Sequence, residues 1–336
     1  MEPAEALRRV AYLLEAEGAR SYKPEAFRRA AATVGEVGPE ELARLDRQGH
    51  LQSLKGVGET TATVITEALA GAVPGYLQVL EERAPVVAPG PAASLLARLR
   101  GDCHSHSNWS DGGAPVEEMA RAAGHLGHEY LALTDHSPRL TVARGLSAER
   151  LRAQLDLVAR LNETMEPFRL LTGIEVDILD DGSLDQDEEL LARLDVVVAS
   201  IHSKLRMPAP EMTPRMVAAV SNPHVDVLGH CTGRIVAGRG RPPSSFEPEA
   251  VFAACAAGGT AVEVNSRPER RDPPVELLTV AVAAGCRFSV DSDAHAPGQL
   301  SWLRVGCEQA AAAGVPVGSV VNAMPLDDFL SWAGRG

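Results

Sequence analysis

The chain has 336 residues, of which 45% are hydrophobic and 23% charged, a balance that can bury a large core and excludes a wholly disordered protein. The 45 Asp and Glu residues outnumber the 32 Lys and Arg residues, so the net charge of −13 excludes a broad basic face but allows a local one. There is no apolar run of the ~20 residues that a membrane span needs, no secretion-like start and no CxxC pair among five cysteines, so we expect a cytoplasmic protein without membrane contact.

Residues 1–84 predict a small all-α domain. Apolar side chains recur at helical spacing over 7–14 and again over 27–34, and Pro39 opens a third, acidic helical segment. The stretch 51–71 predicts two helical runs joined by a tight glycine turn. The Pro-, Ala- and Gly-rich residues that follow predict a linker over 85–99.

Residues 100–336 predict an α/β domain, because short β-branched runs alternate with Ala-, Leu- and Arg-rich helical stretches. Seven such units favour a closed (β/α)7 barrel over an open sheet, with its chemistry at the C-terminal ends of the strands. The predicted strands are 101–104, 130–134, 170–175, 195–200, 225–229, 260–264 and 286–290.

Nearly every predicted strand ends in an imidazole or a carboxylate. Six of the ten histidines fall at these ends, whereas His50, His125, His128 and His224 lie elsewhere and are expected to have no role in a site. Glu263 and Asn265 close the sixth strand, and Asp135 and Asp291 are candidates for orienting ligand histidines. The candidate metal ligands are His104, His106, Asp111, His136, Glu175, His202, His230, Asp293 and His295.

These residue types indicate a metal centre. In the His104-Ser-His106 sequence, side chains two apart on a strand point to the same face and can reach one ion. Imidazole and carboxylate ligands suit Zn, Mn and Fe alike, and nine candidates are too many for one ion. We therefore expect two or three divalent ions and no organic cofactor.

Residues 100–336 resemble the polymerase and histidinol phosphatase (PHP) domain, a distorted seven-unit barrel with a trinuclear metal centre. The resemblance rests on HSHSNWSDG (104–112), LTDHS (133–137), GIEVDIL (173–179), SIHS (200–203), LGHCTGR (228–234), VEVNSRPER (262–270) and SDAH (292–295). The motifs are most similar to the PHP domain of bacterial family X DNA polymerases. The resemblance implies one ion on His104, His106, Glu175 and Asp293, a second on Glu175, His202 and His230, and a third on Asp111, His136 and His295.

Such a cluster implies hydrolysis of phosphoester bonds by a metal-bridged hydroxide, with His104, His106, Glu175, His202 and Asp293 in catalytic positions. Arginines near the rim would bind the substrate phosphate. The candidates for this contact are Arg234, Arg267, Lys204 and Arg139.

The segment KGVGETTATVITEAL (55–69) is typical of a helix-hairpin-helix, with Gly56, Val57 and Gly58 as candidates for contacting the DNA backbone without reading sequence. Residues 1–84 as a whole resemble the N-terminal domain of family X polymerases. Val64 stands where relatives with lyase activity have a lysine, so we expect no lyase chemistry. The segment 85–99 is far too short for a polymerase palm. The first ninety residues carry 10 basic and 13 acidic residues, which predicts weak, salt-sensitive DNA binding.

The leading functional hypothesis is therefore a DNA-processing phosphoesterase, either a 3′→5′ exonuclease or an end-cleaning nuclease. One alternative is a small-molecule phosphatase resembling histidinol-phosphate phosphatase, acting on phosphomonoesters. A second is a DNA-repair scaffold with structural metals, and a third is an amidohydrolase, which would use Lys204 as a bridging ligand.

Overall fold

The computed structural model describes residues 1–19, 22–85 and 88–334. The chain forms two compact units, one of residues 1–86 with 296–299 and one of residues 87–295 with 300–336. Each unit has a hydrophobic core of its own. Among the described residues, no helix combines the length and the apolar character that crossing a membrane requires.

The N-terminal unit is helical. It contains α1 (Pro3–Ala16), α2 (Tyr22–Glu36), α3 (Pro39–Arg47), the 3-10 turn η1 (Leu51–Ser53), α4 (Glu59–Leu69) and α5 (Gly75–Arg83). Its core gathers the apolar stripes expected from the sequence, with Leu7, Phe27 and Val64 all buried. The first helical run expected after residue 50 is only the short turn η1, whereas the second is α4.

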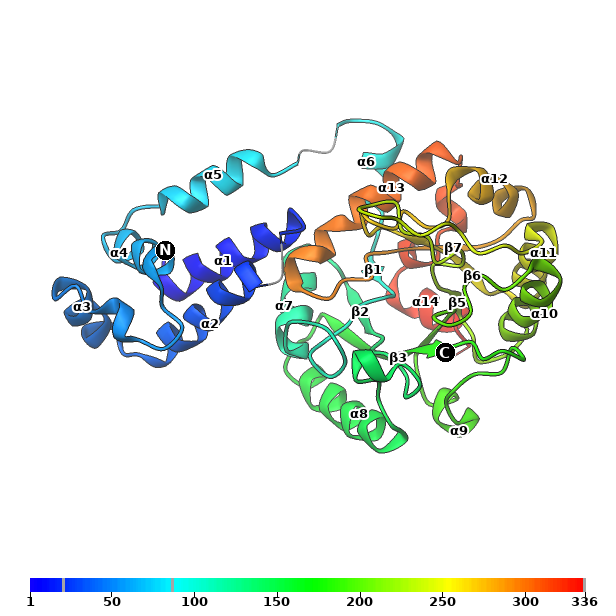
Figure 1. Ribbon diagram of the computed structural model, residues 1–336, viewed down its shortest axis with the longest axis horizontal. Helices are drawn as coiled ribbons and strands as arrows, with labels where there is room; N and C mark the ends of the chain where they lie inside the picture. The colour runs from blue at the N-terminus through cyan, green and yellow to red at the C-terminus, as the bar shows by residue number, and fades with distance from the viewer. Residues whose placement is uncertain (20–21, 86–87, 335–336) are drawn as a thin grey trace. The chain divides into compact units, whose positions relative to one another are not determined.

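The second unit is a barrel of seven parallel strands that follow one another in chain order (Figure 1). The strands are β1 (Gly101–Asp102), β2 (Tyr130–Leu133), β3 (Arg169–Asp177), β4 (Val196–Ser200), β5 (Val227–Leu228), β6 (Ala261–Asn265) and β7 (Phe288–Asp291). Neighbouring strands pair in parallel register from β1 to β7. A parallel bridge between Ser105 and Ala294, just beyond β1 and β7, nearly closes the ring. The expected (β/α)7 barrel is confirmed.

Helices surround these strands (Figure 1), and the apolar faces of the helices pack against the sheet. The α-helices of this unit are α6 (Pro91–Leu96), α7 (Val116–His125), α8 (Ala148–Asn162), α9 (Glu188–Leu191), α10 (Ala209–Val220), α11 (Pro248–Gly258), α12 (Val275–Ala283), α13 (Leu303–Ala312) and α14 (Leu326–Trp332). Short 3-10 turns are η2 (Thr141–Ala143), η3 (Pro297–Trp302), η4 (Val317–Ser319) and η5 (Val321–Ala323). Because all strands run the same way, their C-terminal ends share one rim.

The segment 85–99, expected to be a linker, differs from that expectation. Helix α6 begins at Pro91 and packs against α13. Leu95 and Leu99 are buried in the core of the barrel. The proline and alanine content suggested an extended chain, but Pro91 stands in the first turn of the helix, where it is well tolerated.

Candidate metal centre

Histidine and acidic side chains meet at the C-terminal rim of the barrel. His104 and His106 follow β1, His136 follows β2, and Glu175 lies within β3. The remaining candidates come from the ends of β4, β5 and β7 and from the loop after β1; they are His202, His230, Asp293, His295 and Asp111. The four histidines expected to lie outside a site are absent from the groups with metal-binding spacing found among the described residues.

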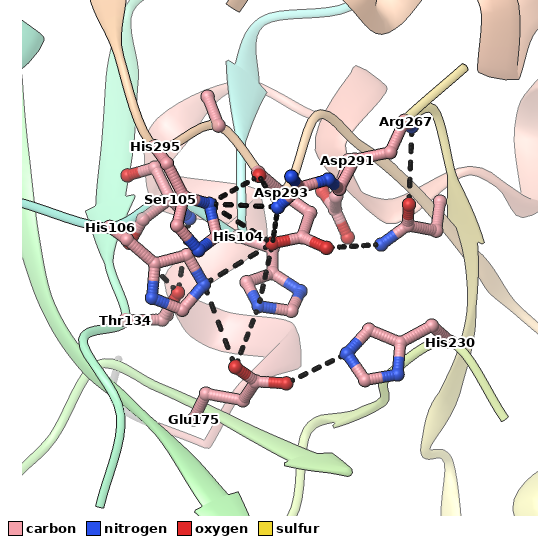
Figure 2. A network of polar contacts seen from close by, with 12 residues as sticks. His104, Ser105, His106, Thr134, Glu175, His230, Arg267, Asp291, Asp293 and His295 are labelled. Carbon is pink, nitrogen blue, oxygen red and sulfur yellow. Dashed lines mark hydrogen bonds and ion pairs between the residues drawn. The ribbon is translucent and has the colours of Figure 1, made fainter. Parts of the chain in front are cut away.

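Glu175 contacts histidines from several strands of this arrangement, and its contact with His230 is seen in Figure 2. Its Oε1 is 2.9 Å from Nε2 of His230 and 3.3 Å from Nε2 of His202. Its Oε2 is 2.8 Å from Nδ1 of His136, 3.3 Å from Nε2 of His104 and 3.5 Å from Nε2 of His106. One carboxylate from β3 thus reaches histidines supplied by β1, β2, β4 and β5.

Three overlapping groups have the spacing that a metal ion needs. They are His104, His106 and Glu175; His136, Glu175 and His202; and His106, Asp111, His136 and His295. The first is the implied set of the first ion without Asp293, and the third is the implied set of the third ion with His106 added. In the second group His136 takes the place that the resemblance gives to His230, although His230 also contacts Glu175.

Burial is graded across the centre. His104, His106 and Glu175 are inaccessible to solvent or nearly so. By contrast, the Asp111 side chain is 36% exposed and that of His295 is 19% exposed, with Nε2 of His295 3.4 Å from Oδ1 of Asp111. The centre is therefore open to solvent on the side of Asp111 and His295, where a substrate can approach.

In the ion-free protein, neighbouring opposite charges shift the pKa values of the acidic and histidine side chains of the centre. Burial alone would raise the pKa of Glu175, but His136, His104 and His202 hold it well below its usual value. Burial likewise opposes ionisation of Asp293, yet Arg267 and His104 hold its pKa well below the usual value. Despite burial, Glu175 and Asp177 raise the pKa of His202 to about 9. A divalent cation would therefore have to displace protons from histidine.

His106 shows the opposite behaviour. Burial, with His295 and His136 nearby, lowers the pKa of His106 well below its usual value. Its ring is therefore neutral at physiological pH, which is the form that ligates a metal. Asp111 stays ionised, because contacts with His295 outweigh burial and lower its pKa.

The donor set fits a cluster of metal ions. Buried ring nitrogens of His104, His106, His136, His202 and His230, with Oε2 of Glu175, have close neighbours but no hydrogen bond of acceptable geometry among the described residues. Leaving buried polar atoms unbonded costs about 1–3 kcal/mol each, so a protein that keeps several of them together has a reason to do so. Metal cations bound by the lone pairs of these atoms would explain why the protein keeps them together without hydrogen bonds.

The four candidate phosphate contacts lie in different environments. Arg267 is at the centre, with Nη1 3.6 Å from Oδ1 of Asp293 and 3.0 Å from Nδ1 of His295. Arg234 instead donates from Nε to the carbonyl of Arg270 at 3.1 Å and from Nη2 to the carbonyl of Arg271. The guanidinium of Arg234 therefore holds the loop after β6 by its backbone.

Lys204 and Arg139 are both exposed and engage acidic side chains. Nζ of Lys204 is 2.5 Å from Oδ2 of Asp180, and Nε of Arg139 is 3.5 Å from Oδ2 of Asp177. Asp177 also lies 3.4 Å from Nδ1 of His202, so Arg139 approaches the centre through one intervening carboxylate.

Arg270 is a site residue that the sequence analysis did not select. Its Nε lies 3.5 Å from Oδ2 of Asp293, and its side chain is 18% exposed. Together with Arg267 it places two guanidinium groups against the two oxygens of Asp293. The motif VEVNSRPER contains both arginines, so the signal was present in the sequence.

Asp135 and Asp291 do not orient ligand histidines through any described hydrogen bond. Asp135 accepts hydrogen bonds from Ser107, Ser110 and Gln154. Asp291 accepts from the backbone N–H of Cys103 and the hydroxyl of Ser289. Both carboxylates therefore stabilise the loops that carry candidate ligands. No described hydrogen bond joins either of them to a histidine ring, contrary to the expectation from the sequence.

In the N-terminal unit, the glycine turn leads into α4. Gly56 has φ of +80°, a left-handed conformation that glycine adopts without strain. The N–H of Val57 donates to the carbonyl of Leu54, and that of Gly58 to the hydroxyl of Thr61. The Val57 side chain is buried, whereas Gly56 and Gly58 are exposed.

A parallel seven-stranded barrel with this rim of histidines and carboxylates defines a metal-dependent phosphoester hydrolase. The chain belongs to the PHP domain family, whose match covers residues 102–266. Residues 1–72 match a helix-hairpin-helix domain.

Two relatives match a large part of the chain. The DNA polymerase/3'-5' exonuclease PolX of Bacillus subtilis is 40% identical over 240 residues, 71% of this chain and 42% of that protein. The chain thus spans less than half the length of this relative. A probable phosphatase of Acetivibrio thermocellus is 31% identical over 204 residues, 58% of this chain and 78% of that protein.

The histidinol phosphate phosphatase of Lactococcus lactis, crystallised with zinc, L-histidinol and phosphate, has a TM-score of 0.43 and 17% identity. The similarity covers 64% of this chain and 92% of that chain.

Proposed function

We propose that the protein is a metal-dependent phosphoesterase that processes DNA ends, as a 3′→5′ exonuclease or an end-cleaning nuclease. One observation carries the proposal: seven potential metal ligands form groups with metal-binding spacing at one barrel rim, with His230 and Asp293 in contact with them, in a chain that also has a helix-hairpin-helix domain. The relative PolX, whose name includes a 3'-5' exonuclease, supports the same activity.

The nine side chains would hold two or three divalent ions, and zinc, manganese and iron all suit this donor set. Bound ions of this kind lower the pKa of water and neutralise charge that develops on a phosphoryl group. Glu175, which faces five histidines, would be shared between ions. Asp111, His136 and His295 would complete the set on the solvent-facing side.

The chain's own cations would fix the phosphate. Arg267 and Arg270 border Asp293, and guanidinium groups bind phosphate oxygens in pairs. Glu269 lies 2.9 Å from Nη2 of Arg267 and holds it in place. Lys204 and Arg139 stand further out, where they would meet phosphates next to the scissile one.

Exposed basic residues in two rim loops favour a polynucleotide. Arg206 follows β4 and Arg239 follows β5, and both are exposed. The two loops are joined, because the hydroxyl of Ser244 donates to the carbonyl of Leu205 at 2.8 Å. A polynucleotide carries further phosphates beside the scissile one, which such cations outside the ligand set would contact.

A small-molecule phosphatase is the second candidate, and the matches to probable phosphatases, which cover 89% and 78% of those proteins, favour it. A repair scaffold with structural metals is less compatible with a centre that opens to solvent, since structural sites are usually closed. The amidohydrolase alternative would need Lys204 as a bridging ligand, yet this lysine is exposed and paired with Asp180.

The test incubates the full-length protein with Mn²⁺ and end-labelled single- and double-stranded DNA, beside small phosphomonoesters, with and without chelator. Loss of labelled 3′ nucleotides, abolished by chelator, supports the nuclease. Hydrolysis of phosphomonoesters with intact DNA supports the phosphatase. DNA binding that survives chelation, with hydrolysis of neither substrate, supports the scaffold.

A further inference from the structure

Strand β6 differs from the other six strands of the barrel. Each of the others ends in at least one of the nine candidate ligands, whereas β6 ends in none. It ends instead in Glu263 and Asn265, which lie two residues apart and so point to the same face. Both side chains are fully buried.

Glu263 uses both of its oxygens within the protein. Oε1 lies 2.6 Å from Nδ1 of His104. Oε2 accepts the backbone N–H of His230 and, at 3.3 Å, the side-chain amide of Asn265. With both oxygens engaged, this carboxylate is a poor candidate for a ligand, and it belongs to none of the groups with metal-binding spacing.

The contact with His104 determines which ring nitrogen is free. A carboxylate oxygen accepts hydrogen bonds, so Nδ1 of His104 carries a proton and donates a hydrogen bond to Glu263. Nε2 is then the nitrogen that faces the centre, 3.3 Å from Oε2 of Glu175 and 3.9 Å from Oδ1 of Asp293, and a metal ion that displaces its proton would bind there. Metal-bound histidines commonly have their other nitrogen held by a carboxylate in this way.

Asn265 connects these contacts of Glu263 to β7. Its Nδ2 donates to Oδ2 of Asp293 at 3.1 Å as well as to Glu263, and its Oδ1 accepts the N–H of Arg267 at 3.1 Å. Through two adjacent side chains, β6 therefore contacts candidate ligands of β1, β5 and β7.

We propose that Glu263 and Asn265 are positioning residues that orient His104 and Asp293 and so set the affinity of the innermost metal position. The inference rests on the proposed metal centre. A carboxylate is needed at 263, because an amide offers one oxygen for two N–H donors, those of His104 and His230. Glu263→Gln keeps the size of the side chain but leaves one of these donors without an acceptor.

The experiment measures Mn²⁺ binding to the full-length protein by equilibrium titration, for wild type, Glu263→Gln and Asn265→Ser. The matched control is Asp195→Asn, since Asp195 also accepts hydrogen bonds from a neighbouring strand, at Thr172, but lies at the other end of the barrel. We expect Glu263→Gln to weaken the tightest Mn²⁺ site by about 10–100-fold. Asn265→Ser should weaken it less, and Asp195→Asn should leave it unchanged.

Excess metal distinguishes the loss of a positioning residue in Glu263→Gln from misfolding of the variant. If Glu263 acts through His104, saturating Mn²⁺ restores turnover of a phosphomonoester by Glu263→Gln, with KM unchanged. A misfolded variant would not recover. Wild-type Mn²⁺ affinity in both variants would overturn the inference while leaving the metal centre standing, whereas a wild-type protein that binds no Mn²⁺ would overturn the proposed function itself.

Discussion

Glu175 and His230 lie 2.9 Å apart, from Oε1 to Nε2, although 55 residues separate them in the chain. The contact exists because β3 and β5 flank β4 in the barrel and end at the same rim. With His136 at 2.8 Å from its other oxygen, Glu175 joins side chains from opposite sides of this rim. Replacing Glu175 is therefore the most direct way to disrupt the site.

Replacing Glu175 by Ala should remove most of the activity. Since this carboxylate belongs to two of the three ligand groups, its loss should disrupt more than one ion position. We expect turnover of phosphoesters to fall by more than about 100-fold, which exceeds the usual effect of residues outside the ligand set. Metal content per chain, measured beside turnover, should fall as well.

His224→Ala is the control for that variant, because His224 lies before β5 and belongs to no ligand group. It should keep both the activity and the metal content. Equal activity of Glu175→Ala and wild type in a metal-replete assay would remove Glu175 from the site.

Chelation should lower thermal stability, and Mn²⁺ should restore it. Ligand present at 100 times Kd stabilises a folded protein by about 2.7 kcal/mol per site. For a domain of this size that corresponds to a rise in Tm of roughly 5–10 °C. The comparison of Tm with chelator and with added Mn²⁺ tests this, and identical melting curves would contradict it.

Affinity for Mn²⁺ should increase as the pH rises from 6 to 9. In the ion-free protein the pKa of His202 is raised to about 9, and that of His104 lies well above its usual value. Both rings are therefore protonated at neutral pH, and a metal ion must displace those protons. Titrations at several pH values should show release of at least about one proton per chain. An affinity independent of pH would mean that these histidines do not bind the metal.

Arg267 and Arg234 should differ in the kind of defect that alanine produces. Arg267 borders Asp293 and His295, so Arg267→Ala should raise KM or lower kcat at full metal content. Arg234 binds backbone carbonyls of the loop after β6, so Arg234→Ala should cost about 1–3 kcal/mol of stability. Steady-state kinetics and urea unfolding of both variants distinguish the two roles. The assignment fails if Arg234→Ala alters KM with unchanged stability.

DNA binding should depend on the glycine turn separately from catalysis. Lys55 and Gly56 are exposed beside the start of α4. Lys55→Glu should weaken binding to DNA of any sequence and reduce its salt dependence, while hydrolysis of para-nitrophenyl phosphate stays unchanged. Binding measured over a range of salt concentrations checks this, with Glu40→Gln on α3 as the control. If Lys55→Glu binds DNA as wild type does, the turn is not the DNA contact.

Much of the fold was predictable because strands and helices here leave strong local signals. All seven expected strands occur within a few residues of their predicted limits, since β-branched runs such as 196–200 are bounded by polar residues. The convergence of histidines followed from the rule that parallel strands end at one rim. Helix α6 was missed because its residues have the composition of a linker, and only the burial of Leu95 and Leu99 reveals its packing.

Side-chain direction was harder to predict from the sequence. Arg234 and Arg270 stand in equally suggestive motifs, yet Arg234 turns to backbone carbonyls and Arg270 to Asp293. Glu263 was visible as a carboxylate at a strand end, but only its contacts with His104 and His230 distinguish a positioning residue from a ligand. Such choices depend on loop conformation, which composition and periodicity do not encode.

The most direct test of the central claim is a crystal structure of the protein grown with Mn²⁺, with anomalous scattering used to locate the ions. We expect two or three Mn²⁺ ions at the barrel rim, within bonding distance of Glu175 and the surrounding histidines. A rim that holds no ion at saturating Mn²⁺, or ions bound only elsewhere on the surface, would contradict the account.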